Sequence, residues 1–371
     1  MIRVDTAFIL DYMPAHEQLC NKFKATITSS INFKNQQEQN FYDFIRNNFA
    51  RIIKMNKNEM LAFIGEINRS HPIVYAAAKR IKQIESRSGY QNNSYKNERQ
   101  NEINEILRSS GCPPVSLKTV AEMKKEACNI IKQNFREKEM FEVIRALFNY
   151  DSFRDRHGTE FIANSKLEAC PYCNRAFIAI YNDGTSFTAD IDHYFPRSKY
   201  PFFGLTLYNL IPSCSLCNER LKLAKDFLEN EHLYPYSEDS ENRVCFKIRS
   251  EERNLDFNDK SSFSILVTPK DTSDIIASAS IDTFRLNDLY QFHKQTVIRM
   301  ARIKRINTPE IRDEIKRLLK LRSDSEINYY FNDLCFWTGK EGILSKFIRD
   351  ISDELDKKFG IIRCSDPTYA D

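Results

Sequence analysis

Apolar residues recur at helical spacing over much of the N-terminal half of the chain. Phe41, Ile45 and Phe49 follow one another at intervals of four residues, which is the periodicity of an amphipathic helix. The segments VSLKTVAEMKKEACNIIKQNF and EMFEVIRALFNY repeat this pattern further along the chain. The polar residues 86–101, rich in Asn and Ser, are typical of an exposed loop. We therefore expect residues 1–164 to form a helical region that contains one long loop.

The pattern changes near residue 165, where two runs rich in aromatic and β-branched residues flank Asn182-Asp183-Gly184. This arrangement predicts a β-hairpin. A helix is then expected to begin at Asn218, whose side chain is a good N-cap, and to continue through ERLKLAKDFLEN. Residues 165–236 are therefore expected to form a separate module of strands followed by a helix.

The C-terminal region, residues 237–371, begins with the alternating segments RVCFKIRS and FSILVTP, which predict two strands. Helical periodicity resumes from Leu286 onward. Thr308-Pro309-Glu310 marks the start of one helix, with Thr at the N-cap and Pro at the first helical position. The complete pattern predicts an α+β protein that is mostly α-helical and carries a small strand-containing module in the middle of the chain.

Composition and charge narrow the class of protein without identifying a partner. The chain has 371 residues, and its 55 Lys and Arg against 51 Asp and Glu leave a formal net charge of +4, too small to indicate a polyanion partner by itself. The first residues lack the apolar region and cleavage site of a secretory signal, and the sequence holds no run of about 18 apolar residues. We expect a cytoplasmic protein without membrane segments, in which ten cysteines favour metal binding over disulfides.

Four of the cysteines form two Cys-x-x-Cys pairs, in CPYC and CSLC: Cys170, Cys173, Cys214 and Cys217. Two such pairs supply the four thiolates of a tetrahedral structural zinc site, because each tight turn directs both of its sulfurs to one point. Redox-active pairs or unrelated buried thiols are the alternative interpretation. A zinc ion with four thiolate ligands has no open position for a substrate, so any chemistry must come from other residues.

Polar residues with catalytic potential lie between and beside these pairs. Asp192 and His193 occur in DIDHYFPRSKYP, Asn209 occurs in YNLIPS, and Asn218 directly follows the second pair. A zinc ion bound by both pairs would hold Asn218 against the strand that carries Asp192 and His193. This constellation resembles the HNH family of nucleases, also called the ββα-metal or His-Me finger group. The match covers DIDHYFPRSKYP and YNLIPSCSLCNERLK, framed by CPYC.

The resemblance implies a role for each of these residues. His193 would be the general base, Asn209 would hold the base and its loop in place, and Asn218 and Asp192 would bind the catalytic metal. Asn218 stands where the family name places a third histidine, and it is similar to the final asparagine of zinc-clamped members. The side chains suit this chemistry, because a neutral imidazole accepts a proton near neutral pH and Mg²⁺ prefers hard oxygen ligands.

Basic residues near the site indicate a nucleic-acid partner. Asp190, on the same strand face as Asp192, and His232, beyond the expected helix, are further residues whose part in the site stays open. An ordinary solvated surface is the alternative interpretation for the basic residues. The candidates for phosphate contacts, with the last as the strongest, are Arg197, Lys199, Arg220 and Lys222.

The sequence therefore predicts a metal-dependent endonuclease that hydrolyses phosphodiester bonds, with DNA favoured over RNA as substrate. Its cofactors would be structural Zn²⁺ and catalytic Mg²⁺ or another divalent cation. The chain also resembles the HNH components of bacterial anti-phage defence systems of the Septu and retron-linked types, which implies an ATPase partner. The alternative is a non-catalytic zinc module that binds nucleic acid or a protein and retains Asp192-His193 for structure.

Overall fold

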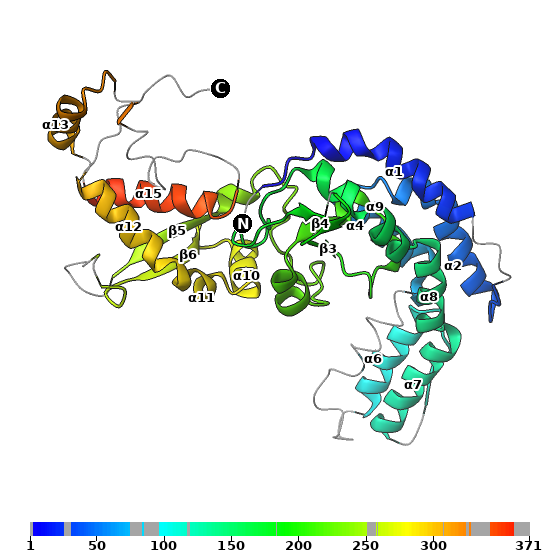
Figure 1. The fold of residues 1–371 in the computed structure, drawn as a ribbon. Helices are drawn as coiled ribbons and strands as arrows, with labels where there is room; N and C mark the ends of the chain where they lie inside the picture. Colours follow the sequence, from blue (N-terminus) through cyan, green and yellow to red (C-terminus); the bar gives the residue numbers. More distant parts are fainter. Residues whose placement is uncertain are drawn as a thin grey trace. The chain divides into compact units, whose positions relative to one another are not determined.

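A computed structural model gives the fold of the chain (Figure 1). It is mixed α/β and mostly helical, in agreement with the expected fold class. The chain divides into two compact units, which we call the helical unit (residues 9–157 and 195–210) and the mixed unit (residues 1–8, 158–194 and 211–371). Residues 165–236, expected to be one module, thus contribute to both units. The structure describes residues 3–25, 31–74, 84, 96–116, 119–182, 184–250, 257, 259–306, 308–323, 326–327 and 342–359.

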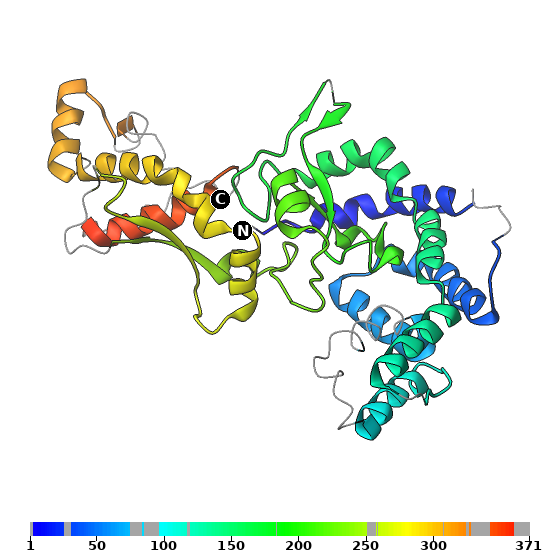
Figure 2. The same ribbon diagram turned by 90° about the horizontal axis from the view of Figure 1, so that it is seen from below.

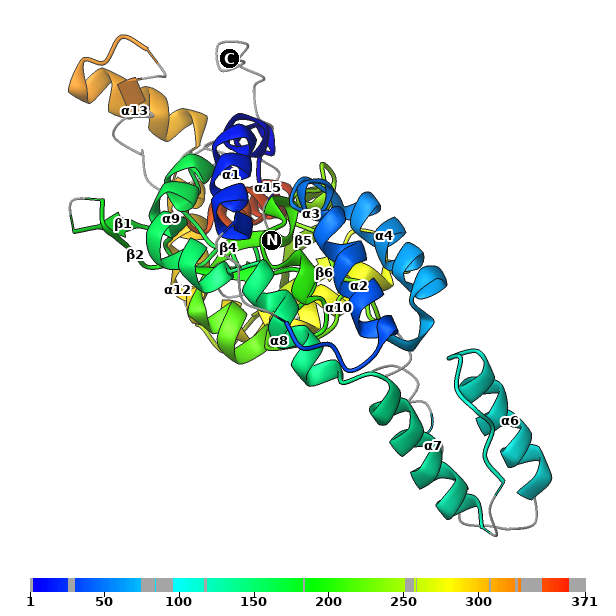
Figure 3. The ribbon, with the colours of Figure 1, turned by 90° about the vertical axis from the view of Figure 1, so that its right-hand side faces the viewer.

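The helical unit confirms the helical periodicity of the N-terminal half. The paired helices α6 and α7 lie side by side (Figure 3). The prediction of a loop over residues 86–101 is wrong for residues 96–101, because α6 begins at Lys96. Residues 86–95 lie outside the described residues. The helices of this unit are most of α1 (Ala7–Ala25), α2 (Gln36–Asn47), α3 (Phe49–Ile52), α4 (Lys57–Ser70), α6 (Lys96–Arg108), α7 (Val120–Asn134), α8 (Glu137–Leu147), half of α9 (Tyr150–Ser165), and the short η2 (Pro201–Phe203) and η3 (Leu207–Asn209).

Aromatic residues form the core of the helical unit and hold residues 195–210 within it. The rings of Phe49 and Phe148 stack with their centroids 4.8 Å apart. Phe203 of η2 packs against Phe63 of α4 at 6.3 Å, and all four side chains are buried. Burial of each large aromatic contributes on the order of 2 kcal/mol, so this cluster explains why a segment distant in sequence joins the N-terminal helices.

Three two-stranded sheets occur among the described residues, and apart from Leu210, the first residue of β4, their strands belong to the mixed unit. The hairpin expected around Asn182-Asp183-Gly184 is confirmed, with antiparallel register from Ile180↔Phe187 to Tyr181↔Ser186, and it extends outward from the rest of its unit (Figure 2). The two strands expected at RVCFKIRS and FSILVTP also pair antiparallel. The strands are β1 (Ile180–Tyr181), β2 (Ser186–Phe187), β3 (Asp190–His193), β4 (Leu210–Ser213), β5 (Val244–Arg249) and β6 (Ser264–Pro269), in the pairs β1–β2, β3–β4 and β5–β6.

Helices cover the β5–β6 hairpin: α15 packs against β5, and α10 and α11 pack against β6. Thr308 caps α13 as expected, because its hydroxyl accepts a hydrogen bond from the Ile311 N–H. None of the described helices has the length and apolar character needed to cross a bilayer. The helical elements of this unit are η4 (Leu216–Lys222), η5 (Ser240–Arg243), α10 (Ile275–Thr283), α11 (Leu286–Tyr290), η6 (Gln291–His293), α12 (Lys294–Ile306), α13 (Pro309–Leu319) and α15 (Ser345–Phe359).

The helix expected to run from Asn218 through ERLKLAKDFLEN is much shorter in the structure. Its counterpart η4 begins at Leu216 and ends at Lys222, and Leu223 then adopts a positive φ of 53°. The turns of η4 are wide, since the Leu223 N–H bonds to the Asn218 carbonyl five residues earlier. Wide π-type turns of this kind are uncommon and often occur at functional sites.

Candidate functional site

The two Cys-x-x-Cys pairs converge on one point in the mixed unit. The sulfurs of Cys170, Cys173, Cys214 and Cys217 all lie within 4.8 Å of one another, and Cys173 Sγ is 3.9 Å from Cys214 Sγ. Four sulfurs bonded to one zinc ion at about 2.3 Å would lie roughly 3.8 Å apart. The donor set and its spacing therefore fit a tetrahedral metal ion such as zinc, as the sequence predicts.

Local backbone structure shapes the first pair into a tight turn. The Asn174 N–H donates to the Cys170 carbonyl at 2.7 Å, and Asn174 itself adopts a left-handed conformation with φ 53°. The buried hydroxyl of Tyr290 donates to the Cys173 carbonyl at 2.7 Å. In the second pair the Asn218 N–H donates to the Cys214 carbonyl at 3.0 Å. Each pair is thus held in its turn by backbone hydrogen bonds.

Asn218 lies against the start of β3. Its side-chain nitrogen donates to Asp190 Oδ2 at 3.2 Å, and both residues are partly exposed. The second cysteine pair and η4 therefore bring Asn218 to the strand that carries the expected catalytic residues. The direct contact is with Asp190, the residue whose part in the site was open, so one carboxylate and one amide are together at this edge of the strand.

The carboxylate of Asp192 is buried and receives a donor on each oxygen. Lys222 Nζ donates to Asp192 Oδ1 at 2.9 Å and to the His193 carbonyl at 2.7 Å. The Tyr172 hydroxyl donates to Asp192 Oδ2 at 2.7 Å. Burial, and then the negative charge of Asp192, raise the pKa of the Tyr172 hydroxyl well above its usual range, so this group stays protonated and acts as a donor to the carboxylate.

This geometry argues against the phosphate contact expected for Lys222. The side chain is 1% exposed and its ammonium is paired with Asp192 inside the protein, because a buried carboxylate needs a compensating charge. Tyr172 and Lys222 are the residues whose roles the sequence analysis missed. Their positions carried a signal: Tyr172 lies inside the CPYC motif, and Lys222 lies one helical turn beyond Asn218.

His193 ends β3 and is largely buried, with 8% of its surface exposed. Asn209 is completely buried in the helical unit, where its side chain accepts a hydrogen bond from the Phe195 N–H at 2.7 Å. The same amide donates to the carbonyls of Phe195 and Phe203 at 3.1 and 3.2 Å. Through these hydrogen bonds Asn209 holds the loop that follows Tyr194 in the sequence.

The other basic candidates differ in the solvent exposure of their side chains and in the partners that these side chains already have. Arg220 is exposed on η4, whereas Lys199 is half-buried. The Arg197 guanidinium lies 3.0 Å from Asp151 and over the ring of Tyr150 at 4.8 Å. Arg220 is therefore the most accessible cation near Asn218 along the chain, and Arg197 would have to exchange a carboxylate partner for a phosphate.

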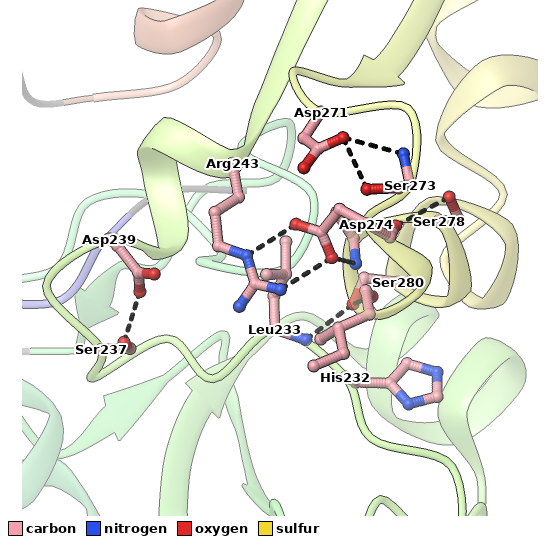
Figure 4. Close-up of polar contacts among 12 residues, drawn as sticks. His232, Leu233, Ser237, Asp239, Arg243, Asp271, Ser273, Asp274, Ser278 and Ser280 are labelled. Atoms are coloured by element: carbon pink, nitrogen blue, oxygen red, sulfur yellow. Dashed lines mark hydrogen bonds and ion pairs between the residues drawn. The ribbon is translucent and has the colours of Figure 1, made fainter.

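His232 is buried inside the mixed unit, next to Leu233 (Figure 4). Its ring stacks on Phe227 with centroids 3.8 Å apart, and its Nε2 lies 2.9 Å from the Thr283 hydroxyl. Burial lowers the pKa of this imidazole, which favours its neutral form. The next residue is also fixed to α10, because the Leu233 N–H donates to the Ser280 hydroxyl at 2.8 Å (Figure 4). His232 thus serves packing.

Comparison of this chain with known protein families, with curated sequences and with solved structures gives no match.

Proposed function

We propose that this chain is a metal-dependent HNH endonuclease that hydrolyses phosphodiester bonds in nucleic acid, with DNA as the preferred substrate. One observation carries the proposal: Asn218, next to the second cysteine pair, contacts Asp190 on the strand that ends in His193. A two-stranded sheet followed by a helical segment is the arrangement that the resemblance implies, and β3, β4 and η4 have that order. The four-cysteine cluster supplies the scaffold that holds them.

The residues of the site divide between proton transfer and cation binding. His193 accepts a proton from the attacking water, and Asn209 holds the loop that follows the strand. Asn218, Asp190 and Asp192 supply oxygen atoms of the hard type that Mg²⁺ binds, with water and phosphate completing the set. Each carboxylate oxygen of Asp192 already accepts one hydrogen bond but retains a further lone-pair site. A bound divalent cation stabilises negative charge on the phosphate and on the leaving oxygen.

Substrate contacts would come from basic residues near the site in the sequence. Arg220 lies on η4 and is exposed, and Lys199 and Arg197 follow β3 in the sequence. Attack of water on the phosphorus leaves a 5′ phosphate and a 3′ hydroxyl. From the resemblance we also propose a role in anti-phage defence together with an ATPase partner.

A second candidate is a zinc module that binds nucleic acid or a protein without catalysis. The buried ion pair of Asp192 with Lys222 favours it, because that pair gives Asp192 a structural task that needs no reaction. The two functions differ in their dependence on His193. Loss of zinc in Cys170→Ser fits both and cannot choose between them.

The decisive experiment is cleavage of supercoiled plasmid, single-stranded DNA and RNA with and without Mg²⁺ or Mn²⁺. The wild type should nick or cut DNA only with the cation, and His193→Ala should lower the rate by at least about 100-fold with unchanged zinc content. His157→Ala on α9 is the control and should cut like the wild type. If no substrate is cut by the wild type, with or without a candidate ATPase partner, or if His193→Ala cuts equally well, the nuclease proposal fails.

A further inference from the structure

The carboxylate of Asp192 accepts one hydrogen bond from each of the two segments that carry the cysteine pairs. Tyr172 lies between the two cysteines of the CPYC motif, and Lys222 lies five residues after Cys217. They reach different oxygens of the same carboxylate, at 2.7 and 2.9 Å. The orientation of the carboxylate plane is therefore set by the two segments that would bind zinc.

We propose that Tyr172 is a positioning residue for the catalytic cation: its hydroxyl orients the Asp192 carboxylate, and so links the zinc cluster to the proposed site on β3. This inference rests on the proposed function, because it assigns Asp192 a part in cation binding. It adds a residue that the resemblance to the HNH family does not supply.

The surroundings of Tyr172 suit such a task. The side chain is completely buried, and its ring stacks on Phe284 with centroids 4.5 Å apart and an interplanar angle of 16°. Stacking fixes the plane of the ring, and cysteines on either side fix the backbone once they share an ion. A tyrosine held in this way places its hydroxyl at a single point, which lies at hydrogen-bond distance from Asp192 Oδ2.

The second donor explains why removal of the hydroxyl should disturb orientation more than folding. Lys222 would still neutralise Asp192 through Oδ1, and it would still hold the His193 carbonyl. The carboxylate would keep its charge partner but could turn about the remaining hydrogen bond. Loss of a hydrogen-bond partner behind a metal ligand typically costs about 10- to 100-fold in metal affinity or activity.

Tyr290 provides a matched control. It is also a fully buried tyrosine, and its hydroxyl donates to the Cys173 carbonyl at 2.7 Å. Tyr290→Phe therefore removes one buried hydroxyl from the same cysteine turn without touching Asp192. A purely structural role for the hydroxyl of Tyr172 predicts that both substitutions have the same effect.

The test is Mn²⁺ binding to the zinc-loaded full chain, measured by electron paramagnetic resonance of the free ion, with zinc content and cleavage rate determined in parallel. We expect Tyr172→Phe to retain zinc, to bind Mn²⁺ about tenfold more weakly and to need more Mn²⁺ for half-maximal cleavage. Tyr290→Phe should bind Mn²⁺ like the wild type.

The outcomes separate this inference from the nuclease proposal. If the wild type binds Mn²⁺ but cuts nothing, the proposed function fails, and the affinity ratio of the variants still decides the role of Tyr172. Equal Mn²⁺ affinity in Tyr172→Phe and the wild type would overturn the inference, and so would an equal loss in Tyr290→Phe. A wild type that binds no Mn²⁺ would overturn it as well.

Discussion

Replacement of Lys222 by Met tests whether the buried ion pair with Asp192 holds the site together. Methionine keeps most of the aliphatic stem but removes the ammonium, which donates to Asp192 Oδ1 at 2.9 Å and to the His193 carbonyl at 2.7 Å. The two charged side chains are 1% and 4% exposed. Water therefore has little access to replace the lost donor, and the carboxylate would stay buried with a hydrogen bond from the Tyr172 hydroxyl.

The size of the loss follows from these contacts. Both lost hydrogen bonds are donated by the charged ammonium, and a hydrogen bond that involves a charged group contributes about 1.5–3 kcal/mol. Their sum agrees with the loss of about 3–5 kcal/mol typical when one partner of a buried ion pair is removed. We therefore expect Lys222→Met to lower the free energy of unfolding by about 4 kcal/mol. Asp192→Asn added to Lys222→Met removes the uncompensated charge, so this second change should cost about 1 kcal/mol or less.

Urea denaturation followed by circular dichroism measures the wild type, the two single variants and the double variant. Free zinc is buffered at one concentration, because a ligand of the folded state shifts the apparent stability. The two substitutions should be non-additive by about 2–3 kcal/mol, and Lys225→Met, at an exposed lysine of the same segment, should change stability by less than about 0.5 kcal/mol. Additive effects, or a loss in Lys222→Met no larger than in Lys225→Met, would refute this account.

Three other substitutions test contacts outside the polar site. Burial lowers the pKa of His16 to about 4. In the unfolded chain His16 has an ordinary pKa of about 6.5, so the unfolded state binds more protons as the pH falls. The free energy of unfolding should therefore drop by about 2 kcal/mol between pH 7 and 5 because of His16. The urea midpoint of His16→Gln should lack this part of the pH dependence. Asn174→Ala removes the acceptor of the Lys346 N–H at the start of α15 and should cost about 2 kcal/mol, with faster hydrogen exchange in α15 as the readout. Arg243→Lys breaks the two parallel hydrogen bonds to Asp274, each 2.7 Å long (Figure 4). It should lower the free energy of unfolding by about 1–2 kcal/mol and therefore lower the thermal midpoint; an unchanged midpoint would contradict this expectation.

Short-range signals predict much of the fold. The turn residues Asn182-Asp183-Gly184 mark the hairpin, since Asn182 and Gly184 both adopt positive φ, which these residue types tolerate. Thr308 and Pro309 mark the start of α13. The convergence of the four cysteines follows from the chemistry of a shared ion and is visible from motif spacing alone. In each case the information lies within a few residues.

Long-range contacts decide what the sequence does not reveal. ERLKLAKDFLEN has good helix propensity, yet the helical segment ends at Lys222, because burial of that lysine against Asp192 outweighs continuation of the helix. Leu223 then takes a positive φ without the Gly or Asn that usually marks such a position. The contact of Asn218 with Asp190 in place of Asp192 likewise depends on the exact turn of η4. No local pattern encodes these choices.

The two aspartates of β3 differ in charge balance, and this difference determines how the edge of the strand would attract a cation. Asp192 faces an ammonium at 2.9 Å, so the pair is neutral and contributes geometry more than potential. Asp190 contacts a neutral amide and forms no ion pair with the residues that the structure describes, so the negative charge next to Asn218 comes from Asp190. A divalent ion bound there would need both: Asp190 to supply charge, and Asp192, held by Tyr172 and Lys222, to supply an oxygen in a defined place. The ion pair that makes Asp192 look purely structural is then also what balances the charge of a buried carboxylate next to His193 in the strand.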